Sequence, residues 1–178
     1  MTVLYNKPGI GYPHCDIGGE YLSNEFRSFM RQQGSDYLTT ITDTAALNGT
    51  AERMNRTIGE RTRALLFDAG LPETFWNFAA LYAVYMINRS PTKALPNNMT
   101  PFEKLTGQKC DYTKLQPFGC VAHARTLTDD DTSSRSDKCI FLGYIPYGYK
   151  LMRLSDCRLL SVRSARFEPT IFFKDLTA

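Results

Sequence analysis

The sequence predicts an α/β protein of 178 residues, in which a mostly helical part is followed by a small β domain. Within residues 23–105, several segments have apolar side chains at the three- and four-residue spacing of helices. After Pro117, short β-branched and aromatic runs alternate with polar or glycine-containing turns, a pattern typical of a small β-barrel. We therefore expect an irregular segment over 1–14, a first domain over 15–112 and a β domain over 118–173.

The first predicted elements are a short helix and a short strand. Ser23 or Asn24 caps the helix, and Gly34 ends it. Residues 37–41 are β-branched and aromatic, so they are expected to form a strand, with residues 42–48 following as a loop.

A long helix is predicted over residues 50–69 and is stopped by Gly70. Its buried face is expected to contain Ala51, Met54, Ile58, Leu65 and Leu66. A second, charged stripe follows another face at helical spacing and consists of Glu52, Arg56, Glu60 and Arg63. This stripe suits either a solvated, ion-paired face or a face that lies along a phosphate backbone.

The next helix, over residues 72–89, is apolar nearly all round, which predicts a buried or interfacial position. Its aromatic side chains favour core packing over a platform for base stacking. A short helix over 101–105 precedes the β domain. Five strands are then expected, over residues 120–125, 139–144, 150–154, 159–162 and 166–167.

Composition sets broad limits on the function. Hydrophobic residues make up 43% of the chain and charged residues 22%, which favours a folded protein over a disordered one. The net charge of +3 is compatible with nucleic-acid binding but does not argue for it. Five widely spaced cysteines without a CxxC pair predict reduced thiols in an intracellular protein, not a zinc site. The sequence has no secretory signal and no apolar run of bilayer length, so no membrane partner is expected.

The most informative feature is a pair of carboxylates, Asp16 and Glu52, with 35 residues between them. Asp16 stands in the segment CDIGGEYLS and Glu52 in LNGTAERMNRT. These segments resemble the integrase of copia-type LTR retrotransposons, a retroviral-type integrase that uses an Asp, Asp, Glu triad. The resemblance implies that the first domain is the C-terminal part of a ribonuclease H-like catalytic core. The segment CIFLGYIPYGYKLMRL resembles the SH3-like module that follows this core in copia-type polyproteins.

The same resemblance implies polynucleotidyl transfer in DNA integration. Asp16 and Glu52 would be the catalytic residues and would bind Mg²⁺ or Mn²⁺. The partners would be the retrotransposon cDNA ends and the target DNA, and an active enzyme would work in the nucleus. Residues implied in DNA contact or in local packing beside it are Asn48, Gly49, Arg53, Asn55, Arg56 and Arg63, of which Asn48 and Gly49 would close the loop before the catalytic helix.

The first Asp of the triad is expected to be missing, because none of the 15 residues before Asp16 is acidic. Asp36 and Asp43 lie in the strand–loop region and are not expected to replace it. The chain alone is therefore predicted to lack strand-transfer activity. Motif positions also depart from the family: Ile17 replaces an Asn, Asp43-Thr44-Ala45 a His-Thr-Pro loop, and Arg163-Ser164-Ala165 an Arg-Asp-Val.

Two other hypotheses remain open from the sequence. The chain could be a non-enzymatic nucleic-acid- or protein-binding remnant of a transposon, or a decayed copy without a selected function. Loss of the early strands of the core would leave apolar helix faces uncovered, which favours self-association.

Overall fold

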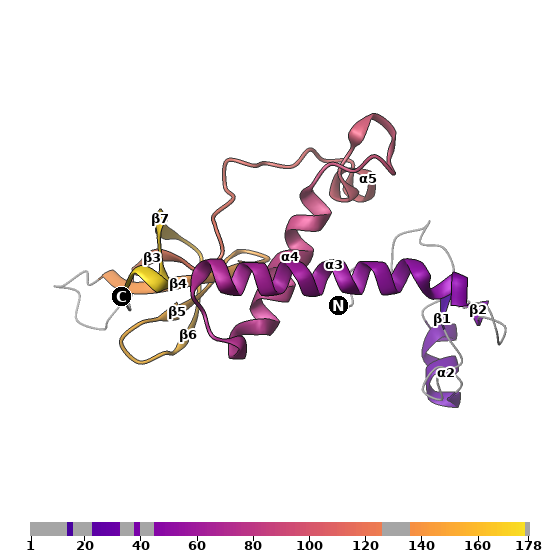
Figure 1. Cartoon of the computed structure of the whole chain (residues 1–178), viewed down its shortest axis with the longest axis horizontal. Coiled ribbons are helices and arrows are strands. Elements are labelled where there is room, and N and C mark those ends of the chain that lie inside the picture. Colours follow the sequence, from indigo (N-terminus) through magenta and orange to yellow (C-terminus); the bar gives the residue numbers. More distant parts are fainter. Residues whose placement is uncertain (1–13, 16–22, 33–37, 40–44, 126–135, 177–178) are drawn as a thin grey trace. The chain divides into compact units, whose positions relative to one another are not determined.

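The computed structural model describes residues 14–15, 23–32, 38–39, 45–125 and 136–176 (Figure 1). The chain forms two compact units, Met1–Arg56 and Thr57–Ala178. The predicted fold class is confirmed: within the described ranges, helices dominate the N-terminal part and a five-stranded antiparallel sheet forms the C-terminal part.

The first unit contains a short parallel ladder and a short helix. Strand β1, His14–Cys15, pairs with β2, Leu38–Thr39, and helix α2 spans Asn24–Gln32. Ser23 caps α2 as predicted, because its Oγ accepts a hydrogen bond from the Phe26 amide at 3.1 Å. Strand β1 includes His14, the last residue of the segment expected to be irregular, and the rest of that segment lies outside the described residues. Of the strand predicted over 37–41, the described residues are those of β2.

Helix α3, Ala45–Ala69, begins five residues earlier than predicted. Residues 45–48 are therefore helical, and the prediction of a loop there is wrong. Ala45, Ala46 and Leu47 are strong helix formers, which accounts for the extension. Local propensity outweighs the Asn48-Gly49 pair, which predicts the end of a loop at this point.

The second half of α3 buries its apolar stripe, whereas the first half does not. Leu66 and Ala69 belong to the hydrophobic core, and Leu65 packs against it. Ala51 and Met54, predicted for the same buried face, are exposed. Helical spacing determines which residues share a face, but contacts with other elements decide whether that face is covered.

Two further helices follow in the second unit. A 3₁₀ turn, Glu73–Phe75, leads into α4, Trp76–Arg89, so the predicted helix is confirmed with a later start. A second 3₁₀ turn, Pro96–Asn98, precedes α5, Pro101–Thr106, which confirms the predicted short helix.

The sheet contains the five predicted strands, two of which are markedly longer than expected. They are β3 (Cys120–Arg125), β4 (Ser136–Ile145), β5 (Gly148–Arg153), β6 (Leu159–Val162) and β7 (Ala165–Phe172). The order across the sheet is β6-β5-β4-β3-β7, and neighbouring strands are antiparallel (Figure 1).

The sheet is strongly curled. Tyr149 on β5 and Phe167 on β7 have ring centroids 4.8 Å apart, although β4 and β3 lie between these strands. Three strand steps across a flat sheet would cover roughly 14 Å. The sheet must therefore bend β5 and β7 toward each other, as the strands of a small barrel do.

The core lies between this sheet and the helices α3 and α4. Ile140, Phe141 and Leu142 are consecutive and fully buried, so both faces of β4 are covered. Tyr82 of α4 packs edge-on against Phe141, with ring centroids 6.0 Å apart. Its hydroxyl donates a hydrogen bond to the Gln116 carbonyl oxygen at 2.7 Å, and burial raises the pKa of Tyr82.

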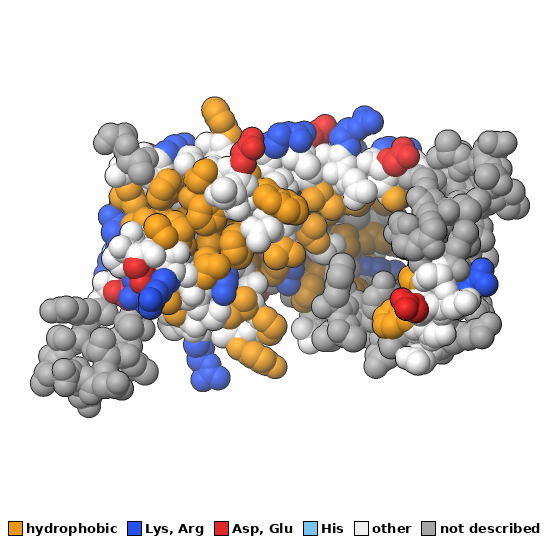
Figure 2. All heavy atoms as spheres, turned by 90° about the horizontal axis from the view of Figure 1, so that it is seen from below, with side chains coloured by type: hydrophobic (Ala, Val, Ile, Leu, Met, Phe, Trp, Pro, Cys, Tyr) orange, Lys and Arg blue, Asp and Glu red, His pale blue; other side chains and the backbone are white. Residues whose placement is uncertain are grey.

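Helix α4, expected to be buried or interfacial, is buried on one side and exposed on another. Ala79 and Ala83 are buried, while Trp76 is 63% and Leu81 70% exposed. Figure 2 shows hydrophobic side chains gathered on the face of the second unit that it presents. None of the helices within the described ranges has the length and apolar character needed to cross a membrane.

Candidate nucleic-acid interface

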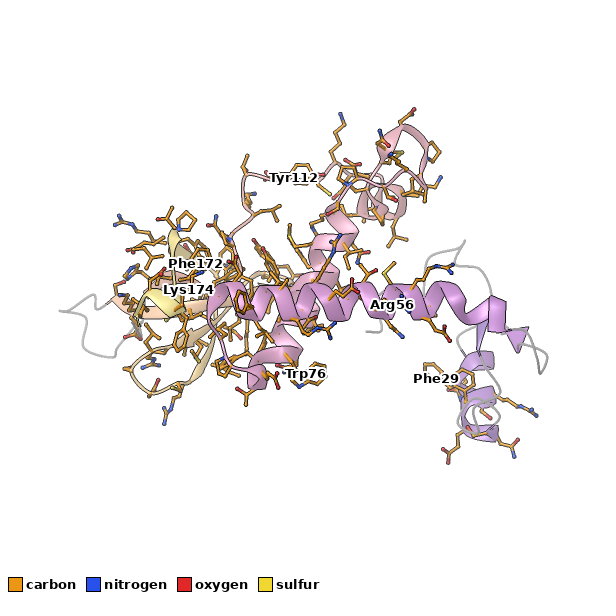
Figure 3. The ribbon with its side chains drawn as sticks, viewed as in Figure 1. Phe29, Arg56, Trp76, Tyr112, Phe172 and Lys174 are labelled. Carbon is orange, nitrogen blue, oxygen red and sulfur yellow. The ribbon has the colours of Figure 1, made fainter. Side chains whose placement is uncertain are left out.

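Helix α3 carries Glu52 and every residue predicted to contact DNA. The exposed side chains are those of Glu52, Arg53, Asn55, Arg56 and Arg63. Figure 3 shows Arg56 projecting from the helix. Asp16 and the side chain of Asn48 lie outside the described residues.

The spacing on α3 places Glu52 and Arg56 one turn apart on the same face. Arg53 lies close to the preceding turn, because its Nη1 is 3.2 Å from the position that a β-carbon at Gly49 would occupy. Gly49 was expected to close a loop before the helix, and the structure corrects this: it is a helical residue. Its lack of a side chain leaves space for the Arg53 guanidinium.

Of the two residues predicted to bind a metal ion, Glu52 lies within the described residues and Asp16 does not. In the ranges that are described, no three His, Cys, Asp or Glu side chains gather in a way that could hold a metal ion. Glu52 itself fits the role of a ligand, because it is an exposed carboxylate of the kind that Mg²⁺ prefers. The structure does not bring it together with a second described carboxylate in such a group.

A second candidate site, which the sequence did not predict, is a cavity of about 500 Å³ within the second unit. It is formed by the end of α4, the segment after α5, the β4–β5 turn and the β6–β7 turn. We call it the tyrosine pocket. Its aromatic lining consists of Tyr85, Phe102, Tyr144, Tyr147 and Tyr149, and its cationic lining of Arg89, Lys109, Lys114 and Arg163.

Arg89 is held in this pocket by two aromatic rings. Its guanidinium carbon lies 3.5 Å from the ring centroid of Tyr85 and 4.4 Å from that of Phe102. Its Nη1 donates a hydrogen bond to the Tyr85 carbonyl oxygen at 3.4 Å, and its own carbonyl oxygen accepts one from the Tyr112 hydroxyl at 3.1 Å. These contacts fix a planar cation at one wall of the cavity.

Tyr144 joins the pocket to the core. Its ring stacks on Tyr85, with centroids 4.4 Å apart. Its hydroxyl accepts a hydrogen bond from the Gln116 amide at 2.6 Å and donates one to the Lys114 carbonyl oxygen at 3.1 Å. Burial raises the pKa of Tyr144 to about 12, so this hydroxyl stays neutral at physiological pH.

Two sequence signals could have indicated this pocket. The segment of residues 144–149 contains three tyrosines around a Pro-Tyr-Gly turn, and the segment 109–114 combines two lysines with a tyrosine. Basic residues interleaved with aromatic ones are typical of nucleic-acid binding. The sequence does not reveal that the two segments meet, since about 30 residues separate them and only the fold brings them together.

Comparison with known proteins finds relatives among retrotransposon polyproteins. The chain is 41% identical over 140 residues to the retrovirus-related Pol polyprotein from transposon TNT 1-94 of Nicotiana tabacum, covering 76% of this chain. It is 36% and 35% identical over 167 residues to the corresponding polyproteins from transposons RE1 and RE2 of Arabidopsis thaliana, covering 92% of this chain. No family model matches the chain.

These matches establish homology to Pol polyproteins over most of the chain. The chain spans 10–11% of the length of these three relatives. It therefore corresponds to one segment of a much longer kind of protein.

Proposed function

We propose that this chain is part of a copia-type retrotransposon integrase, because it is homologous to a segment of Pol polyproteins and contains the Asp16 and Glu52 motifs. Residues 15–112 would be the C-terminal part of the ribonuclease H-like core, and residues 118–173 its SH3-like module. The observation that carries the proposal is the homology over 92% of the chain. The curled antiparallel sheet after Pro117 supports the assignment of the second part.

The chemistry proposed for the complete enzyme is a transesterification, in which a DNA 3′-hydroxyl attacks a phosphodiester of a target strand. A new phosphorus–oxygen bond forms, the bond from phosphorus to the 3′-oxygen of the target strand breaks, and that oxygen leaves as a 3′-hydroxyl. Asp16 and Glu52 would hold Mg²⁺ or Mn²⁺, which when bound would activate the attacking hydroxyl and stabilise the charge that develops on phosphorus. Glu52 is suited to this because its carboxylate is exposed on α3. The remaining acidic ligand would come from a longer polypeptide.

The arginines of α3 would position the DNA. Arg53, Arg56 and Arg63 are exposed along the helix that carries Glu52, and arginine pairs well with phosphate oxygens. Contacts of this kind fix the register of a duplex without reading its sequence, and their strength falls as salt rises.

The proposal predicts that the isolated chain has no strand-transfer activity and that the chain extended upstream in its own reading frame does. In the extended protein, Glu52→Gln is expected to abolish metal-dependent transfer, because the amide cannot replace the carboxylate as a charged ligand. Glu60→Gln is the matched control, since Glu60 lies two turns later on the same exposed face. The activity of both variants is measured as strand transfer of a labelled DNA end in the presence of Mg²⁺ or Mn²⁺.

Metal-dependent transfer by the isolated chain, abolished by Glu52→Gln, would refute the predicted inactivity. An in-frame stop immediately upstream of Met1 would rule out an enzymatic role for this product. In that case a non-enzymatic nucleic-acid-binding remnant is the second candidate, which the combination of cations and aromatic rings in the tyrosine pocket favours.

A further inference from the structure

The lining of the tyrosine pocket carries a net positive charge. Its lining contains four cationic side chains and one carboxylate, that of Asp111. Asp111 is already engaged, because its Oδ2 lies 3.3 Å from Lys114 Nζ and its Oδ1 accepts hydrogen bonds from the Thr113 hydroxyl and amide. These bonds and the Lys114 charge lower the pKa of Asp111, so it remains ionised and offsets a single cation.

The cations come from different elements. Arg89 ends α4, Lys109 and Lys114 lie on the segment after α5, and Arg163 lies in the β6–β7 turn. A single phosphate group pairs with one or two cations, whereas a strand with several phosphates can reach cations on separate segments. The distribution of charge therefore fits a polyanion whose charges are spaced along a chain.

The pocket also presents an aromatic ring to the solvent. Tyr147 lies in the β4–β5 turn and is 84% exposed, so its ring is not required for the core. Tyr149, which also lines the cavity, packs inward with its ring centroid 6.1 Å from that of Phe141. An exposed ring beside a cationic cavity is the arrangement that stacks on a nucleobase.

We propose that the tyrosine pocket binds an unpaired nucleotide of a nucleic-acid strand. The base would stack on Tyr147, and the phosphates would pair with Lys109 and Arg163, beside the fixed guanidinium of Arg89. A cavity of about 500 Å³ lies within the usual range for a site that holds a ligand of nucleotide size. In a duplex the bases are stacked on their neighbours, so the pocket should prefer single-stranded or frayed ends.

This inference rests on the proposed nucleic-acid-binding function, but it makes a different prediction. The arginines of α3 would bind phosphates of single strands and duplexes alike, whereas the tyrosine pocket would contribute to single strands alone. The ratio of single-strand to duplex affinity therefore reports on the pocket, and Glu52-dependent strand transfer reports on the proposed enzyme.

The test uses the full chain and fluorescence anisotropy with a short labelled oligothymidine strand and a duplex of equal length. Tyr147→Ala is expected to weaken single-strand binding about fivefold or more and to leave duplex binding unchanged. Tyr147→Phe should retain the affinity, because the ring is kept. Trp76→Ala is the matched control, since Trp76 is an exposed aromatic residue outside the pocket.

The cations are tested in the same way. Lys109→Ala and Arg163→Ala should each weaken single-strand binding and make it less dependent on salt. Lys93→Ala removes an exposed cation outside the pocket and should have a smaller effect on the strand-to-duplex ratio. Thermal unfolding of every variant checks that the fold is intact, which is expected because Lys109, Tyr147 and Arg163 are exposed.

Competition identifies the source of the nucleotide. Displacement of the strand by unlabelled oligothymidine, but not by thymidine monophosphate at equal nucleotide concentration, would support a strand as the ligand. Equal displacement by the monophosphate would show that the ligand is a free nucleotide and not a strand.

Tighter binding of a phosphotyrosine peptide would overturn the proposal. Unchanged single-strand affinity in the Tyr147, Lys109 and Arg163 variants would also overturn it. If single-strand affinity is unchanged in these variants while the extended protein retains Glu52-dependent strand transfer, the nucleotide-binding role of the pocket is refuted and the proposed enzymatic function is not.

Discussion

At the scale of single residues, two glycines have similar backbone conformations and different surroundings. Gly107 (φ +70°) ends α5, and Gly119 (φ +77°) precedes β3. A β-carbon at Gly107 would meet nothing within 4 Å, whereas one at Gly119 would lie 2.3 Å from the β-carbon of the buried Ala69. The pair therefore separates the cost of backbone strain from the cost of a steric clash.

Gly119→Ala is expected to destabilise the protein more than Gly107→Ala. Both changes cost about 1–2 kcal/mol for a side chain in the left-handed region. Gly119→Ala adds about 1–3 kcal/mol, because α3 and β3 must move apart to accommodate the methyl group. Urea unfolding of the two variants measures the difference, and equal losses of stability would show that the close packing of Ala69 on Gly119 does not matter.

At the scale of elements, the N-terminus of α5 is capped by the hydroxyl group of one residue, Thr100. Thr100 is 1% exposed, and its Oγ1 accepts a hydrogen bond from the Glu103 amide at 3.0 Å. Glu103 Oε2 in turn accepts one from the Thr100 amide at 3.0 Å, which completes a capping box. The bond from the Thr100 amide to the Glu103 carboxylate is the main cause that lowers the pKa of Glu103. A helix of six residues depends on such a cap, because so few of its amides have partners within the helix.

Thr100→Ala is expected to cost about 1 kcal/mol of unfolding free energy, because the Glu103 amide loses its acceptor. Thr100→Ser keeps the hydroxyl and should retain most of the stability. Urea unfolding followed by circular dichroism distinguishes the two variants. If serine were as damaging as alanine, the lost methyl packing, not the cap, would explain the effect.

At the scale of the whole molecule, the second unit buries several weak acids in neutral form. Cys120 is fully buried, and burial raises the pKa of its thiol from 9.0 to about 12. The pKa of Tyr144 rises from 10.0 to about 12, chiefly for the same reason. In the alkaline range the unfolded chain therefore releases protons that the folded chain still holds.

This difference predicts loss of stability in alkali. A raised folded-state pKa contributes stability that is fully present below the unfolded-state pKa and is lost as the pH rises toward the folded-state value. The free energy of unfolding should therefore fall as the pH rises from about 9 to about 12. Urea unfolding over this range measures the slope. Cys120→Ala should make the slope shallower, and an unchanged slope would contradict the contribution of this thiol.

The sequence by itself determined most elements of this protein. Every predicted strand of the β domain is present, because alternating β-branched residues and turn residues act locally. The predicted helices are also present, because helical spacing and caps act locally, although α3 begins at Ala45 and not at the predicted residue 50. The exposed polar face of α3 with Glu52 and Arg56 also followed from helical spacing alone.

Tertiary structure decided which faces are covered and which residues meet. Met54 and Leu81 lie in apolar patterns and are exposed, while Tyr149 and Phe167 touch only because the sheet curls. The tyrosine pocket arises in the same way, from Arg89, Lys109 and Tyr147 on three segments that the fold brings together. Periodicity describes neighbours along the chain, whereas burial and binding sites depend on contacts between distant segments, which no local pattern encodes.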